Sequence, residues 1–148
     1  AFIRSSLTPL FILAALAAGA DFAYIGSAFL ATDEANAQAE YKDMIVQSTA
    51  SDIIYSNLFT GIHGNYLRGS IESAGMDPFN LPQSDPSAMN FASAAGASAK
   101  AWKDIWGAGQ GVGSVKSRTT VAELVSRLKS EFDEANARLC SRVAVFDL

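Results

Sequence analysis

Apolar residues at helical spacing mark the C-terminal part of the chain as its clearest element. Thr120-Val-Ala-Glu123 has the form of a capping box, in which a threonine and a glutamate satisfy the free amides at a helix start. An apolar stripe follows at three- and four-residue intervals, made of Val121, Leu124, Val125, Leu128, Phe132, Ala135 and Leu139. The pattern predicts a long amphipathic helix, with Asp133 and Glu134 on its solvated face.

The first part of the chain predicts a helix followed by a strand, the order of elements in an α/β repeat. Thr8 and Pro9 are start signals for a helix of strong helix formers over 10–18, and Gly19 is placed to end it. The apolar run Phe22 to Ile25 predicts a short parallel strand covered on both faces. Residues 2–20 also resemble a secretory signal; we favour the helix, and the run is too short to cross a bilayer.

The middle of the chain predicts two more helices separated by an ambiguous segment. Thr32 can cap a helix that runs past Ile45 and leaves Lys42 in solvent. Residues 52–60 are rich in β-branched and aromatic side chains, so they form either a strand or an extended segment. Asn65 is placed to cap a short helix with Leu67, Ile71 and Ala74 on one face and Gly75 at its end.

Two further segments separate these helices from the C-terminal one. Three prolines predict a surface loop over 77–87. The alanine-rich stretch after it is expected to be helical, with Trp102 and Trp106 on one face. The glycine cluster 107–113 is either a connection between helices or backbone that approaches a ligand closely, and Gln110 is its one polar side chain able to donate and accept.

Composition narrows the class of protein. The 148 residues, 49% hydrophobic and 18% charged, suffice for one globular core. A net charge of −4 argues against a nucleic acid or an anionic membrane as partner. Cys140 is the only cysteine, which excludes an internal disulfide and favours a cytoplasmic location. With one histidine, His63, a histidine-rich zinc site is excluded, and no metal site is expected.

Candidate chemistry concentrates where the first predicted strand ends. Gly26 and Ser27 follow the strand and offer backbone amides and a hydroxyl, as a phosphate-binding turn does. The alternative is an ordinary turn. His63 lies in a loop that contains glycines, and we expect it to be an ordinary loop residue and not a proton shuttle. No serine has the Gly-x-Ser-x-Gly surroundings of a hydrolase nucleophile, so we expect no catalytic residue in this chain.

Several of these segments resemble one family. They are Ala14-Ala-Leu-Ala-Ala-Gly-Ala-Asp21, the strand ending in Ile-Gly-Ser, Phe29-Leu-Ala-Thr-Asp-Glu-Ala35, Tyr41-Lys, Phe59-Thr-Gly, Tyr66-Leu-Arg68 and Trp106-Gly-Ala-Gly-Gln-Gly-Val-Gly113. Together they resemble the C-terminal part of nitronate monooxygenases, formerly 2-nitropropane dioxygenases, which are FMN-binding TIM (β/α)8 barrels. The resemblance implies an α/β fold class, mostly helical in this chain with one clear β-strand: the last helix–strand units of a barrel and its helical extension.

The resemblance also implies a cofactor and its ligands. In the family, the motif after the eighth strand holds the FMN phosphate, and it falls on Tyr24, Ile25, Gly26 and Ser27. Gln110 would shape the flavin pocket. Phosphate sites near the last strands are a general feature of this barrel. The family's catalytic histidine lies on an earlier strand, so His63 does not inherit its role, and no counterpart of the family's Gly-Gly phosphate clamp precedes Gly19.

The expected function is therefore that of an FMN-dependent oxidoreductase that oxidises alkyl nitronates, small-molecule substrates, with dioxygen. A flavin-type enoyl-acyl-carrier-protein reductase and a non-catalytic helical domain or truncated remnant are the alternatives. Residues 13–139 carry the resemblance, whereas 1–12 and 140–148 are atypical, as a truncated or spliced reading frame would leave them. A full barrel takes about 250 residues, so we expect this chain alone to bind FMN weakly or not at all, to be inactive and to self-associate.

Overall fold

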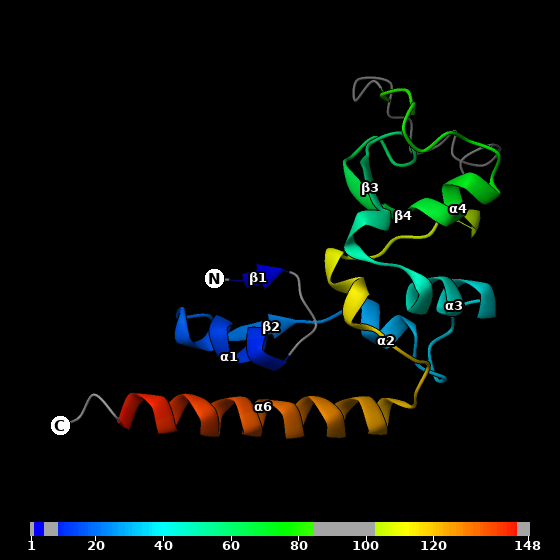
Figure 1. Cartoon of the computed structure of the whole chain (residues 1–148). Helices are drawn as coiled ribbons and strands as arrows, with labels where there is room; N and C mark the ends of the chain where they lie inside the picture. Colours follow the sequence, from blue (N-terminus) through cyan, green and yellow to red (C-terminus); the bar gives the residue numbers. More distant parts are fainter. Residues whose placement is uncertain (1, 5–8, 85–102, 145–148) are drawn as a thin grey trace.

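The chain begins with a strand–helix–strand unit. The computed structural model describes residues 2–4, 9–84 and 103–144 (Figure 1). Strand β1 (Phe2–Arg4) pairs in parallel with β2 (Phe22–Tyr24), and helix α1 (Pro9–Ala17) connects them. Gly19 follows α1 with a φ of +85°, as expected of a helix-ending glycine. The helix and the strand predicted here are confirmed, while Thr8 lies outside the described residues.

Strand β2 is exposed on one face, contrary to the expectation of a strand covered on both. Phe22 and Tyr24 are 70% and 68% exposed. Alternate residues of a strand point to opposite faces, so these two rings share a face, and Ala23, on the other, is half-buried. Helix α1 contacts β2, but no described element covers the rings of Phe22 and Tyr24. The apolar run therefore marks a face that the described residues leave open.

The helix predicted from Thr32 begins later. A one-turn helix, α2 (Ser27–Leu30), starts directly after Gly26, and the next helix, α3, covers Ala39–Gln47. Thr32 is buried: its hydroxyl donates to the carbonyl of Phe29, and its backbone forms a parallel bridge with Thr119. Thr32 thus ties the N-terminal part to the segment before the last helix, and it does not cap α3.

Lys42 of α3 is buried, which corrects its assignment to solvent. Its side chain is 5% exposed, and its ammonium group donates to the carbonyl of Asp33 at 3.0 Å. The later start of α3 places the 33–36 turn over Lys42, and the turn offers the carbonyl that a buried ammonium needs. Ile45 is fully buried, as predicted.

The ambiguous segment over 52–60 contains a strand. After the short 3-10 helix η1 (Ala50–Asp52), β3 (Ile53–Ser56) pairs antiparallel with β4 (Gly64–Leu67), and α4 (Arg68–Ser73) follows. Asn65 is therefore a strand residue, and its prediction as a helix cap is wrong. Its partner in β3, Tyr55, lies outside the single turn of chain in which a cap signal acts, so the local pattern did not reveal the pairing. Gly75, at φ +79°, ends α4 as predicted.

The segment after the undescribed residues 85–102 returns to the hairpin. The amide of Leu67 donates to the carbonyl of Trp106, and the amide of Ala108 donates to the carbonyl of Asn65. The 3-10 helix η3 (Gln110–Ser114) then contacts α3 and η1. Residues 77–84 lack helix and strand, as predicted for a loop. Trp102 and most of the alanine-rich helix predicted before Trp106 lie outside the described residues.

Helix α6 (Val121–Val143) is the longest element. Its predicted capping box is present: the Thr120 hydroxyl accepts from the amide of Glu123, whose carboxylate accepts from the amide of Thr120. Figure 1 shows α6 running alongside α1 and α2, which it contacts. Of the predicted stripe, Leu124 and Ala135 are buried, whereas Val125 and Leu139 are exposed. Asp133 pairs with Lys129 at the surface.

Two clusters of buried side chains hold these elements together. The larger joins α2, α3, β4, η3 and α6 through Ala28, Ala31, Ile45, Leu67, Ala108, Val112, Val115 and Leu124. The smaller lies under the hairpin and α4 and consists of Tyr66, Ile71 and Ile105. Together they fix the end of β2, the hairpin and the glycine-rich segment relative to one another. Among the described residues, no helix is both long and apolar enough to cross a bilayer.

Candidate functional site

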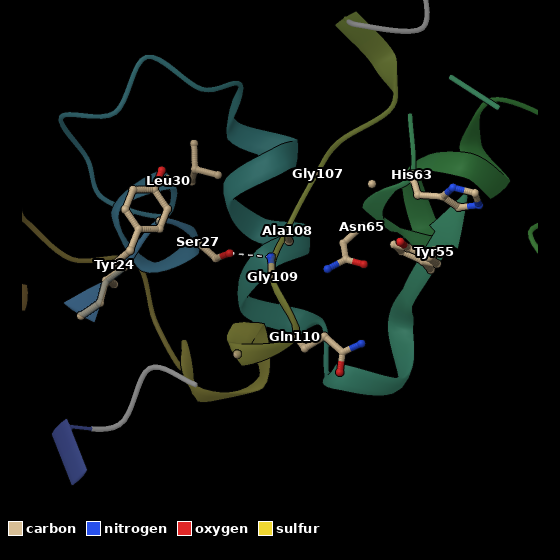
Figure 2. A pocket seen from close by; sticks show the side chains of 14 residues that line it. Tyr24, Ser27, Leu30, Tyr55, His63, Asn65, Gly107, Ala108, Gly109 and Gln110 are labelled. Atoms are coloured by element: carbon tan, nitrogen blue, oxygen red, sulfur yellow. Dashed lines mark hydrogen bonds between the residues drawn. The ribbon is translucent and has the colours of Figure 1, made fainter. Parts of the chain in front are cut away.

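A cavity of about 680 Å³ lies where three distant segments meet (Figure 2). One wall is the end of β2 and the start of α2, the second is the glycine-rich stretch 107–111, and the third is the β3–β4 hairpin. All five residues singled out from the sequence line this cavity: Tyr24, Ile25, Gly26, Ser27 and Gln110. A volume of this size is typical of small-molecule and cofactor sites.

Two backbone amides for which the described residues supply no acceptor lie at the β2 end of the cavity. No hydrogen-bond acceptor is recorded among the described residues for the amides of Gly26 and Ser27. The Ser27 hydroxyl oxygen accepts from the amide of Gly109 at 2.8 Å, so its own hydrogen remains free to donate. Because α2 has only four residues, these amides contribute more to anion binding here than a helix dipole does.

Gly26 leaves space at this end of the cavity rather than relieving backbone strain. Its φ of −114° is one that any residue adopts. Among the described residues, a Cβ added there would have the Tyr24 ring, at 3.7 Å, as its only neighbour within 4 Å. A larger side chain at this position would therefore extend into room that a ligand can use.

The glycine-rich wall is fixed from behind by an aromatic pair. The Tyr41 ring stacks on Trp106 with a centroid separation of 5.1 Å, and its hydroxyl donates to the carbonyl of Gly107. Burial raises the pKa of Tyr41, so the phenol stays protonated and remains a donor at neutral pH. The partner of Trp106 in the described residues is thus Tyr41. Gly107 and Gly109 have negative φ, and their lack of a side chain lets the backbone pass close to Asn65 and Ser27.

The third wall was not foreseen as part of a site. Tyr55, His63 and Asn65 all line the cavity, and the rings of Tyr55 and His63 stack at 4.8 Å. His63, expected to be a loop residue, does precede β4 directly. The alternation of Ile54 with Tyr55 and of Asn65 with Tyr66 was the available signal, but it acquires meaning only once the two strands are known to pair.

The cavity lacks formal charge although the protein is acidic. None of the cavity-lining residues among those described is an aspartate, glutamate, lysine or arginine, while the whole chain has a net charge of −4. Its polar groups are amides, hydroxyls, carboxamides and an imidazole, most of which can donate. No cluster of three or more potential metal ligands occurs in the described part of the chain. The lining accommodates an anionic or neutral ligand better than a cation.

Solved structures with the same arrangement define the class of protein. Nitroalkane oxidase from Streptomyces ansochromogenes matches 89% of this chain with a TM-score of 0.63 and 30% identity, and the match covers 38% of that protein. FabK from Thermotoga maritima matches 87% with a TM-score of 0.61 and 21% identity, and the match covers 42% of it. The fold is the C-terminal portion of a TIM (β/α)8 barrel, as predicted, and the described residues contain three short strands besides the expected β2.

Sequence comparison assigns the family. The family model described as nitronate monooxygenase matches residues 11–131, and the chain belongs to this family. A protein of Mycobacterium tuberculosis H37Rv named "Putative monooxygenase Rv1533" is 38% identical over 84 residues, which are 56% of this chain and 21% of that protein. The chain thus spans about a fifth of this relative and about two fifths of the two structures. The family is flavin-dependent, which supports a flavin as cofactor.

Proposed function

We propose that this chain supplies the phosphate-binding end of an FMN site in an oxidoreductase that oxidises alkyl nitronates with dioxygen. One observation carries the proposal: the amides of Gly26 and Ser27, without recorded acceptors in the described residues, lie in the lining of the cavity. Unpaired amides at such a turn bind phosphate oxygens without a cationic side chain. Membership of the nitronate monooxygenase family supports the choice of reaction.

The residues present fit the anionic tail of FMN. The Ser27 hydroxyl can donate to a phosphate oxygen while it accepts from Gly109, so the tie between two walls persists when the ligand binds. Tyr24 and Ile25 line the approach to this end. The absence of carboxylates from the described lining removes the repulsion that a phosphate dianion would otherwise meet.

In this proposal, the remaining lining residues orient the flavin and take no part in the reaction itself. The flavin, when bound, accepts the electrons of nitronate oxidation and passes them to dioxygen. Gln110 projects from the glycine-rich wall and can both donate to and accept from a polar ring edge (Figure 2). We assign no catalytic residue and no metal in this chain. A cytoplasmic location remains part of the proposal, from the single cysteine.

Neither alternative function has an observation of its own in its favour. The likeness to FabK, at 21% identity, concerns the fold and not the reaction of an enoyl-acyl-carrier-protein reductase. A non-catalytic remnant would give colourless protein that does not respond to added FMN.

The test is a titration of the purified chain with FMN and with riboflavin, which lacks the phosphate, followed by flavin fluorescence. Because the chain spans about two fifths of the related structures, we expect weak but saturable binding, with FMN preferred. Gly26→Val should abolish the preference because its side chain occupies the phosphate space. Ser27→Ala should weaken FMN binding about tenfold, as loss of a hydrogen bond to a charged group does.

Ser51→Ala is the matched control, because Ser51 is exposed and lies outside the cavity. It should bind FMN as the unmodified chain does. Equal affinity for FMN and riboflavin, or no saturable binding up to about 1 mM, a weak affinity by any standard, would contradict the proposal.

A further inference from the structure

The β3–β4 hairpin has one polar face, and this face lines the cavity. Tyr55 and Asn65 are directly opposite each other in the strand register, and His63 precedes Asn65 by two residues. Residues two apart or directly opposed lie on the same side of a sheet. The other face carries Ile54 and Tyr66, which belong to the buried cluster under the hairpin.

Backbone hydrogen bonds at Asn65 and Leu67 join β4 to the start of the glycine-rich wall. The carbonyl of Asn65 accepts from Ala108 at 3.3 Å, and the amide of Leu67 donates to Trp106 at 2.7 Å. These bonds flank an isolated antiparallel bridge between Tyr66 and Gly107, so the 106–108 segment runs beside β4. Figure 2 shows the Asn65 side chain directed into the space between Gly109 and Tyr55.

The side chains on this face carry donors for which the described residues supply no acceptor. No hydrogen bond of the Asn65 carboxamide, the His63 imidazole or the Tyr55 hydroxyl is recorded among the described residues. Tyr55 is 69% exposed, and His63 is stacked on it, so the imidazole is supported without being capped. Asn65 and His63 can each offer an N–H to one oxygen of a planar anion.

We propose that Asn65 and His63 form the subsite for the anionic oxygens of the substrate, with Tyr55 supporting the imidazole. This inference rests on the proposed function, in which the phosphate occupies the opposite, Gly26–Ser27 wall. The ligand class is a small planar oxyanion, a nitronate or a carboxylate of similar shape. A wall that offers the N–H groups of a carboxamide and an imidazole favours such a ligand over a long acyl chain, which has no oxygen to accept from them.

The experiment uses the single histidine as a spectroscopic probe. His63 is the only histidine of the chain, so its imidazole gives one set of NMR signals. Ethyl nitronate and propionate should each shift these signals saturably, whereas 1-propanol, similar in size but neutral, should not. Asn65→Leu, which keeps the volume but removes the donor, should weaken binding of both anions about tenfold. Asn65→Asp should weaken it at least as much, because a carboxylate repels the anion.

Asn36→Leu is the matched control, an exposed asparagine outside the cavity, and should leave both affinities unchanged. Shifts that do not saturate, equal shifts with 1-propanol, or unchanged affinity in both Asn65 variants would overturn the inference. The same samples are titrated with FMN to separate the two proposals. FMN binding without anion binding removes only this subsite, whereas anion binding at His63 without FMN binding removes the proposed flavin site and leaves an anion site.

Discussion

Asp52 illustrates how one carboxylate joins two local structures. It accepts hydrogen bonds from the backbone amide and the hydroxyl of Thr49, both at 2.8 Å, and pairs with Arg68 of α4 at 2.5 Å. The Thr49 amide, then its hydroxyl, and finally the charge of Arg68 lower the pKa of Asp52. The side chain thereby connects η1 to the start of α4 on the far side of the hairpin.

This lowered pKa makes a signed prediction for stability. The carboxylate stabilises the fold above its ordinary pKa of 3.8, and the contribution disappears as the pH falls through the lower folded-state value. Asp52→Asn should therefore lower the free energy of unfolding at neutral pH, by about 1 kcal/mol or less for a partly exposed pair. The difference from the unmodified chain should shrink below pH 3.8.

Urea denaturation at a series of pH values measures this effect. Asp21→Asn, in an exposed residue with no partner recorded in the described part of the chain, should unfold like the unmodified protein. A constant difference between Asp52→Asn and the unmodified chain down to the most acidic pH would exclude the ionised form as its source.

At the scale of elements, α3 supports the cavity without lining it. Tyr41 projects from α3 to stack on Trp106 and to donate to the carbonyl of Gly107, while Trp106 in turn donates its amide to the hydroxyl of Ser70 in α4. The start of the glycine-rich wall is thus fastened to two helices. Neither contact involves a residue that we propose to touch FMN.

Tyr41→Phe tests this support. The variant keeps the stacked ring but leaves the Gly107 carbonyl without its donor, so we expect a loss of about 1 kcal/mol in the free energy of unfolding. Tyr41→Leu, which also removes the stacking, should lose more. Urea denaturation followed by circular dichroism measures both. Equal stability of Tyr41→Phe and the unmodified chain would mean that the hydroxyl bond contributes nothing to this wall.

Elements whose signals are local were predicted well, and those defined by distant partners were not. The capping box of α6 and the glycines after α1 and α4 act within one turn of chain, and all three are present. Asn65 also looked like a local cap. Its pairing with Tyr55 and Ala108 depends on segments ten and more than forty residues away, and these override its cap preference.

The same distinction applies to the residues that line the cavity. The Gly26–Ser27 turn and Gln110, which line the cavity, were singled out because a glycine next to a polar residue is visible in sequence. Tyr55, His63 and Asn65 were missed because only strand register brings them to one face. The buried Lys42 was missed because its partner is a backbone carbonyl, which any sequence could supply.

At the scale of the whole molecule, one face of β2 is covered by none of the described elements. Phe22 and Tyr24 lie on this face at the edge of the cavity wall, beside the partly exposed α1. Exposed aromatic rings on a short, two-stranded sheet favour association with another apolar surface. Self-association of this chain therefore remains our prediction.

Sedimentation equilibrium tests this prediction. The unmodified chain should show a concentration-dependent increase in mass, and Phe22→Ser should reduce it because it removes an exposed ring from the contact. Phe79→Ser is the matched control, since Phe79 is 78% exposed but lies in the loop after α4. A chain that is monomeric at every concentration, or equally affected by both substitutions, would contradict an interface at β2.

The bond between the Ser27 hydroxyl and the amide of Gly109 joins residues 82 positions apart in the sequence. A ligand that binds between these two backbone segments needs both of them in place, so it binds the folded chain and not the unfolded one. Such a molecule should raise the melting temperature progressively with its concentration, by mass action. Melting temperatures measured with a panel of small anions would then rank these anions by affinity, without an assay of enzyme activity.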